Sequence, residues 1–293
     1  MNKYFSLVKF VHTVFALPFA MIGFTLGIKE FSISNWGWLL LEVLICMVAA
    51  RNSAMGYNRY LDRDIDAKNP RTSGREIPAG VLSPKNVKWF VIINCIVFIV
   101  AAFFINPLCG FLSPIALVIL LGYSYMKRVS ALCHFVLGLS LAIAPIGAYI
   151  AVSGLVALAP AIISLIVLLW VSSFDILYSL SDEEFDKENN LHSIPAFMGR
   201  KNAMILSGIL HALVLPLLVL FYFIAFSTST SSIAGTQLNW IYIVGASIFG
   251  CLLIYQHCIV SPLNLTRLNA AFFTTNGVAS IVFALFTIVA LIN

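Results

Sequence analysis

Long apolar stretches separated by short polar segments follow one another along the chain. Each is close to the roughly 20 residues that an α-helix needs to cross a bilayer. None shows the every-second-residue alternation of a membrane β-strand. The pattern therefore predicts an all-α integral membrane protein with nine transmembrane helices. The expected spans are residues 10–28, 36–57, 87–105, 108–126, 131–152, 156–180, 202–226, 239–260 and 270–292.

Composition agrees with this pattern and excludes several classes of protein. Hydrophobic residues make up 61% of the chain, charged residues only 10%, and the mean hydropathy is +0.99. Soluble domains have about 45–50% apolar and about 25% charged residues. A soluble enzyme, a secreted disulfide-bonded domain and a nucleic-acid-binding module are therefore excluded. We expect one membrane domain over residues 1–293 and no nucleic-acid partner, while the oligomeric state stays open.

The distribution of basic residues predicts how the chain crosses the membrane. With nine spans, sixteen of the seventeen lysines and arginines fall on one side, and only Lys29 falls on the other. The positive-inside rule makes the basic side cytoplasmic. The N-terminus and the long polar loops are then cytoplasmic, and the C-terminus lies outside. For a bacterial protein this corresponds to the inner membrane.

An acidic motif covers residues 58–66, where the second span is expected to continue as a helix. Asn58, Asp62 and Asp66 are spaced i, i+4, i+8 and therefore share one helical face. Asp64 lies on a different face. A polar loop over residues 67–86 follows.

A second acidic motif covers residues 175–186, at the end of the sixth span, and a polar loop over 187–201 follows it. Its members are Asp175, Tyr178, Asp182 and Asp186. On a continuous helix, this spacing would place them on one face. Adding 120 to the positions of the first motif gives the last three of these. Two opposed carboxylate faces at one membrane surface suit Mg²⁺ ions that also bind a diphosphate. A solvated acidic face and a cation transporter without chemistry are the alternatives.

Basic residues near both motifs are candidates for binding anions. Arg71 and Arg75 lie in the first loop, and Lys127 and Arg128 follow Tyr123 in the turn between the fourth and fifth spans. Arginine is suited to bidentate binding of phosphate or carboxylate. Arg51 lies seven residues before the first motif, deeper in the second span, where a charge should have an anionic partner.

These motifs resemble those of the UbiA superfamily of intramembrane prenyltransferases. Asn58-x3-Asp62-x3-Asp66 is similar to its first signature, and Asp175-x2-Tyr178-x3-Asp182-x3-Asp186 is similar to its second. The resemblance implies nine helices around a central cavity. It also implies Mg²⁺-dependent transfer of an isoprenyl chain from a diphosphate to an acceptor, usually aromatic.

Within this scheme we expect roles for individual residues. Arg51, as a charge deep on the face of the first motif, would bind a carboxylate of the acceptor, and a purely structural ion pair is the alternative. Asn58 and Asp175 would contact substrate, and Asp182 would remove the ring proton. The aromatic faces of Tyr123 and Tyr178 would stabilise the allylic cation. The Mg²⁺ ligands would be Asn58, Asp62, Asp66, Asp182 and Asp186. The groups that bind diphosphate would be Arg71, Arg75, Lys127 and Arg128. Lys9 and His12 could line the acceptor pocket.

The two polar loops are most similar to the 4-hydroxybenzoate polyprenyltransferase branch. The similarity lies in residues 71–80 and 191–195, and it is closest to a subgroup from bacteria that make menaquinone. The expected substrates are a polyprenyl diphosphate and 4-hydroxybenzoate or a similar aromatic acid. A dihydroxynaphthoate precursor of menaquinone is the alternative acceptor.

Overall fold

The described part of the computed structural model forms helices and no β-strand. It comprises all residues except 1–2, 9–14, 227–238, 262–264 and 266. The short helix α1 (Lys3–Val8) precedes the bundle. The long helices are α2 (Leu17–Phe31), α3 (Trp36–Asp66), α4 (Pro84–Ile105), α5 (Pro107–Met126), α6 (Cys133–Ser153), α7 (Leu158–Ser179), α9 (Ile194–Phe226), α10 (Trp240–Ile259) and α11 (Asn276–Ile292).

Eight segments of the described chain are long and apolar enough to cross a membrane. The first expected span is represented by α2, which has only 15 described residues. Residues 10–14 of that span, His12 among them, and Lys9 just before it lie outside the described residues. The helical membrane fold is therefore confirmed, and the count of nine spans stays a prediction.

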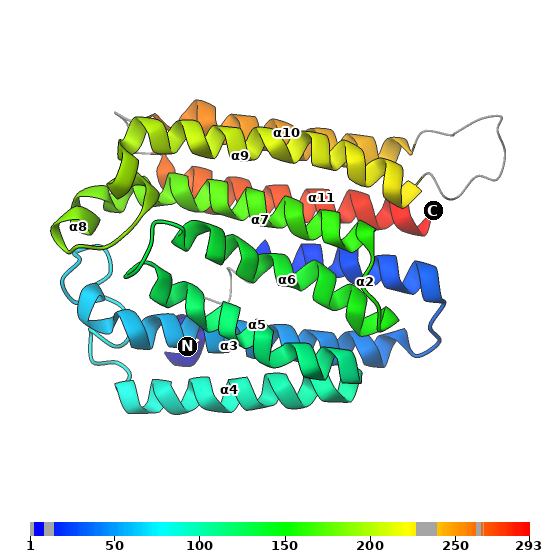
Figure 1. Ribbon diagram of the computed structural model, residues 1–293, viewed down its shortest axis with the longest axis horizontal. Helices are drawn as coiled ribbons and strands as arrows, with labels where there is room; N and C mark the ends of the chain where they lie inside the picture. Colours follow the sequence, from blue (N-terminus) through cyan, green and yellow to red (C-terminus); the bar gives the residue numbers. More distant parts are fainter. Residues whose placement is uncertain (1–2, 9–14, 227–238, 262–264, 266) are drawn as a thin grey trace.

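The long helices pack side by side in one bundle (Figure 1). Helices α9 and α10 cover one side, α4 covers the opposite side, and α2, α6, α7 and α11 lie between them. Small residues allow close approach, as is usual between membrane helices. A Cβ on Gly23 of α2 would overlap the backbone carbonyl of Pro145 in α6, so these two helices are in direct backbone contact.

Local sequence signals explain several helix ends. The Ser83 side chain accepts a hydrogen bond from the Asn86 amide and caps α4, which begins with a proline. Asn106 alone separates α4 from α5, and its side chain caps α5 by accepting from the Cys109 amide. Gly154 ends α6 with a φ of 67°, a left-handed conformation that favours glycine.

The helix of the second acidic motif is not continuous, and this corrects the single face expected from the sequence. Helix α7 ends at Ser179, a 3₁₀ turn covers Leu180–Asp182, and the short helix α8 covers Glu183–Glu188. The acidic residues are therefore distributed over three elements. Helix α8 lies at the same end of the bundle as the loop after α3, on the left in Figure 1, whereas the C-terminus lies at the opposite end.

Candidate active site

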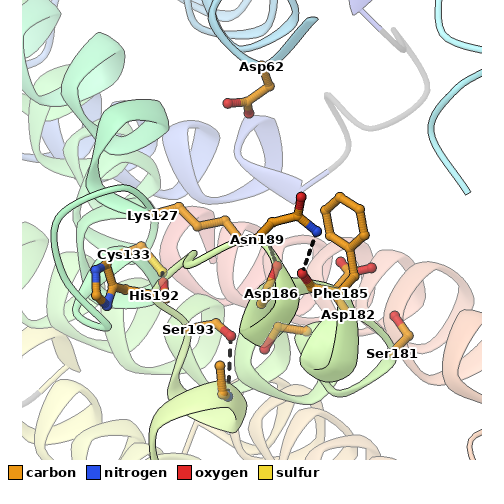
Figure 2. Close-up of polar contacts among 12 residues, drawn as sticks. Asp62, Lys127, Cys133, Ser181, Asp182, Phe185, Asp186, Asn189, His192 and Ser193 are labelled. Atoms are coloured by element: carbon orange, nitrogen blue, oxygen red, sulfur yellow. Dashed lines mark hydrogen bonds and ion pairs between the residues drawn. The ribbon is translucent and has the colours of Figure 1, made fainter. Parts of the chain in front are cut away.

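The two acidic motifs face each other at the end of the bundle that carries α8. Asp62 points from α3 toward the side of the site where Lys127, Asp182 and Asp186 lie (Figure 2). Asp186 is fully buried, and Asp182 is only 8% exposed. Residues more than a hundred positions apart in the sequence therefore form one charged cluster.

Each of these carboxylates contacts a basic side chain. Arg71 makes a bidentate pair with Asp182, at 3.1 Å from Nε to Oδ1 and 2.6 Å from Nη2 to Oδ2. Arg75 Nη1 lies 2.7 and 2.8 Å from the two oxygens of Asp66. Two further pairs complete the cluster, with nitrogen–oxygen distances of 2.7 Å for Lys127–Asp186 and 2.8 Å for Arg128–Asp62.

The acidic neighbours keep two of these cations charged. Burial by itself would lower the pKa of Lys127, but the adjacent Asp186 carboxylate outweighs burial and the pKa is raised above its ordinary value. The pKa of Arg71 is raised for the same reason, because Asp182 offsets the effect of burial. Both groups are therefore cationic at neutral pH and suited to an anionic ligand.

Tyr178 lies between this cluster and the apolar interior of the bundle. Its hydroxyl accepts a hydrogen bond from Arg71 Nη1 at 2.9 Å. Its ring stacks on Phe272, with the centroids 4.1 Å apart, and Phe272 packs in turn against Phe174 at 5.2 Å. Phe272 belongs to a π-helical turn (Ala270–Thr275) that leads into α11. An aromatic surface thus begins where the charged cluster ends.

The side chain of Asn58 is hydrogen-bonded to those of Asp62 and Arg59. Its amide nitrogen donates to Asp62 Oδ2 at 2.9 Å, and its amide oxygen accepts from Arg59 Nη1 at 3.1 Å. Tyr123, on α5, lies within electrostatic reach of Asp62 and of the arginines at positions 51 and 59. The first motif and the turn after α5 therefore belong to the same site.

Asp175 is paired inside the bundle. Its Oδ2 lies 2.6 Å from Nδ1 of His134, a residue at the start of α6. His134 Nε2 accepts a hydrogen bond from the Ile194 amide at 3.3 Å, so Nδ1 is the nitrogen that donates to the carboxylate. His134 was not among the residues predicted from the sequence. No local spacing could have done so, because its partners lie 41 and 60 residues away.

The turn before α6 also holds the segment that follows α8. The His192 amide donates to the Lys127 carbonyl at 2.7 Å, and the Cys133 thiol donates to the His192 carbonyl at 3.4 Å. The Leu191 amide donates to the Asp186 carbonyl at 2.8 Å. These bonds fix the backbone on both sides of the Lys127–Asp186 ion pair.

The fold and this geometry can be compared with known proteins. Residues 16–278 match the UbiA prenyltransferase family. The chain belongs to that family. It is an integral membrane prenyltransferase, and the sequence-based resemblance is confirmed.

Relatives of this UbiA prenyltransferase include proteins named 4-hydroxybenzoate octaprenyltransferase. The one from Aeromonas hydrophila is 27% identical over 247 residues, covering 84% of this chain and 82% of that protein. The one from Aliivibrio fischeri strain ES114 is 29% identical over 253 residues, covering 85% and 83%.

Solved structures of UbiA homologues share the fold. The apo structure of the homologue from Aeropyrum pernix K1 superimposes with a TM-score of 0.80 at 29% identity and covers 95% of this chain and 97% of that one. The homologue from Archaeoglobus fulgidus bound to DMAPP and Mg²⁺ has a TM-score of 0.71 at 20% identity and covers 99% of each chain. At this level of identity, the similarity to the Archaeoglobus fulgidus homologue shows a common fold only.

The carboxylates of the two acidic motifs are suited to a Mg²⁺ ion that is shared between the protein and a substrate. The donors are carboxylate oxygens, the ligands that this hard cation prefers. In the described part of the chain no three His, Cys, Asp or Glu side chains converge on one point. The acids instead approach from α3 on one side and from α8 and the preceding turn on the other. An ion held by one or two carboxylates keeps further positions for substrate oxygens and water.

Proposed function

We propose that the protein transfers a polyprenyl chain from a polyprenyl diphosphate to 4-hydroxybenzoate or a similar aromatic acid. One observation carries the proposal: carboxylates from two distant motifs meet across the site and alternate with four cations. Such a set binds a metal and a diphosphate together. The names of the curated relatives and the ligands of the Archaeoglobus fulgidus structure support it.

Five side chains would hold the Mg²⁺ ions, which neutralise diphosphate charge when bound. These are Asn58, Asp62, Asp66, Asp182 and Asp186. The cations would exchange their carboxylate partners for diphosphate oxygens, and these are Arg71, Arg75, Lys127 and Arg128. As the bond between C1 of the prenyl chain and the diphosphate oxygen breaks, the electron pair stays on the diphosphate, where the four cations stabilise it.

The allylic fragment that remains is electron-poor at C1. The rings of Tyr178 and Tyr123 would face it and contribute about 1–2 kcal/mol each by cation–π attraction. An acceptor ring carbon ortho to the phenol oxygen attacks C1, and the ring proton passes to a base, for which Asp182 is our candidate. Arg51 would bind the acceptor carboxylate, and Asp175, held by His134, would contact substrate.

The membrane supports this chemistry in two ways. The prenyl tail stays in apolar surroundings, and water, which would quench the cation to an alcohol, is excluded. We propose that the protein lies in the bacterial inner membrane as one domain, with the N-terminus and the active-site loops cytoplasmic and the C-terminus outside. The distribution of basic residues in the sequence supports this orientation.

A transfer assay on purified protein in lipid tests the proposal. The protein receives a polyprenyl diphosphate and Mg²⁺ with either 4-hydroxybenzoate or 1,4-dihydroxy-6-naphthoate, and EDTA serves as the control. We expect EDTA-sensitive prenylation of 4-hydroxybenzoate. Product with only the naphthoate would move the acceptor to the menaquinone precursor. No product with either acceptor would refute the assignment.

Neighbouring acids on α3 provide a matched pair of variants. Asp62 faces the site, whereas Asp64 is largely exposed and pairs with Arg63 at 3.5 Å. We expect Asp62→Asn to abolish transfer and Asp64→Asn to retain it. Equal activities of the two variants would contradict the assignment of the first motif.

A further inference from the structure

Two arginines inside the bundle have no acidic partner in the part of the chain that the structure describes. Five of the eight arginines pair with Asp or Glu, and Arg267 is exposed at the surface. The other two are Arg51 and Arg59, both on α3, and neither has a carboxylate within 4.0 Å among the described residues. The residues outside the described part contain no Asp or Glu that could serve as a partner.

Arg59 is the less solvent-exposed of the two. It is only 4% exposed, its sole hydrogen bond among the described residues goes to the Asn58 amide oxygen, and its Nε is buried without a partner. Buried charges in proteins are normally paired, because an unpaired one loses its hydration without compensation. An unpaired guanidinium retained at this position indicates a negatively charged ligand.

The surroundings of Arg59 place that ligand at the active site. Arg59 follows Asn58 directly, and it shares Tyr123 as an electrostatic neighbour with Arg51. The helical rise puts the Cα atoms of the two arginines about 12 Å apart along α3. Arg59 therefore stands at the level of the first acidic motif, and Arg51 stands deeper in the bundle.

We propose that Arg59 binds an oxyanion of the substrates through its planar guanidinium group. The chemistry is a pair of phosphate or carboxylate oxygens, the geometry that a guanidinium recognises in a bidentate manner. The oxyanion comes either from the diphosphate of the donor or from the carboxylate of the acceptor. This inference rests on the proposed function and adds a residue to which that proposal gives no role.

A structural role for Arg59 predicts a different outcome. Asp66 and Glu76 are electrostatic neighbours of Arg59 beyond ion-pair distance, and they could stabilise it as part of the fold. In that case, removing the charge would destabilise the ligand-free protein and leave ligand affinity unchanged. If Arg59 serves a ligand, removing its charge should relieve a desolvation penalty and stabilise the ligand-free protein, as often happens at binding sites.

The experiment measures binding and thermal unfolding of the purified full-length protein in detergent with Mg²⁺. The probes are inorganic diphosphate and 4-hydroxybenzoate, each titrated into wild type, Arg59→Met and Arg59→Lys. Arg63→Met is the matched control, because Arg63 lies one turn further along α3, donates to the Tyr60 carbonyl and pairs with the exposed Asp64.

We expect Arg59→Met to weaken binding of one probe by about tenfold to a hundredfold, the effect of losing charged hydrogen bonds. The affected probe identifies the source of the oxyanion. Arg59→Lys should be intermediate, Arg63→Met should bind like wild type, and the midpoint of unfolding of ligand-free Arg59→Met should not fall.

Wild-type affinity of Arg59→Met for both probes, with a lowered unfolding midpoint, would overturn the inference and leave the proposed function standing. If Arg59→Met does not fold, Arg59→Lys decides the question, and wild-type affinity for both probes then overturns the inference. Failure of wild type to bind either probe would overturn the proposed function itself.

Discussion

The Lys127–Asp186 ion pair allows a quantitative test of the site. Asp186 is fully buried, and its Oδ1 lies 2.7 Å from Lys127 Nζ. Removing one partner of a buried pair costs about 3–5 kcal/mol, because the remaining charge is uncompensated. The Lys127 side chain is 35% exposed, so water reaches one side of the pair. The cost should therefore lie at the lower end of this energy range. We expect Lys127→Met to lower the free energy of unfolding by about 3 kcal/mol.

Metal dependence makes this prediction specific to the proposed site. A ligand that binds only the folded state stabilises it by about 2.7 kcal/mol at one hundred times its Kd. If Asp186 is a Mg²⁺ ligand, saturating Mg²⁺ should therefore restore most of the stability lost in Lys127→Met. The double variant Lys127→Met/Asp186→Asn has no buried carboxylate at this position, so Mg²⁺ should stabilise it much less.

The assay is SDS titration of purified protein in mixed micelles, with and without Mg²⁺. Lys187→Met is the control, because Lys187 is 52% exposed and pairs with Glu183 one turn away. Loss of such an exposed pair costs about 0.5 kcal/mol or less. The reasoning is refuted if Lys127→Met is as stable as Lys187→Met, or if Mg²⁺ stabilises the single and double variants equally.

Three further predictions concern other contacts. Arg71→Lys keeps the charge but loses the bidentate pair with Asp182, so kcat/KM for prenyl transfer should fall about tenfold. An unchanged kcat/KM would exclude a role for the two-pronged guanidinium contact. His134→Ala leaves the Asp175 carboxylate and a backbone amide unpaired, so the free energy of unfolding should fall by about 2 kcal/mol. His134→Gln should recover part of this loss, and equal stability of wild type and the alanine variant would contradict the prediction. Gly23→Val forces α2 away from the backbone of α6 and should cost about 3 kcal/mol or more in the same titration, and a neutral effect would disprove close helix contact.

Helical periodicity and hydrophobic length are local properties, and both could be derived from the sequence. The length of the apolar stretches predicted the membrane helices because a bilayer has one thickness. The spacing of Asn58, Asp62 and Asp66 placed them on one side of α3, which continues without interruption to Asp66. The same reasoning was wrong for the second motif, where the 3₁₀ turn at Leu180–Asp182 breaks the helix before Asp186.

Pairing between distant residues depends on how the helices pack, and only the tertiary structure decided it. The sequence identified Arg71 and Asp182 as separate candidates, but they are 111 positions apart and no spacing rule connects them. The partners of His134, and the lack of an ion pair at Arg59 within the described part of the chain, are consequences of the same packing. The sequence by itself therefore determined the membrane helices and the inventory of charges. Packing determined which charges neutralise each other and which ones remain available to a ligand.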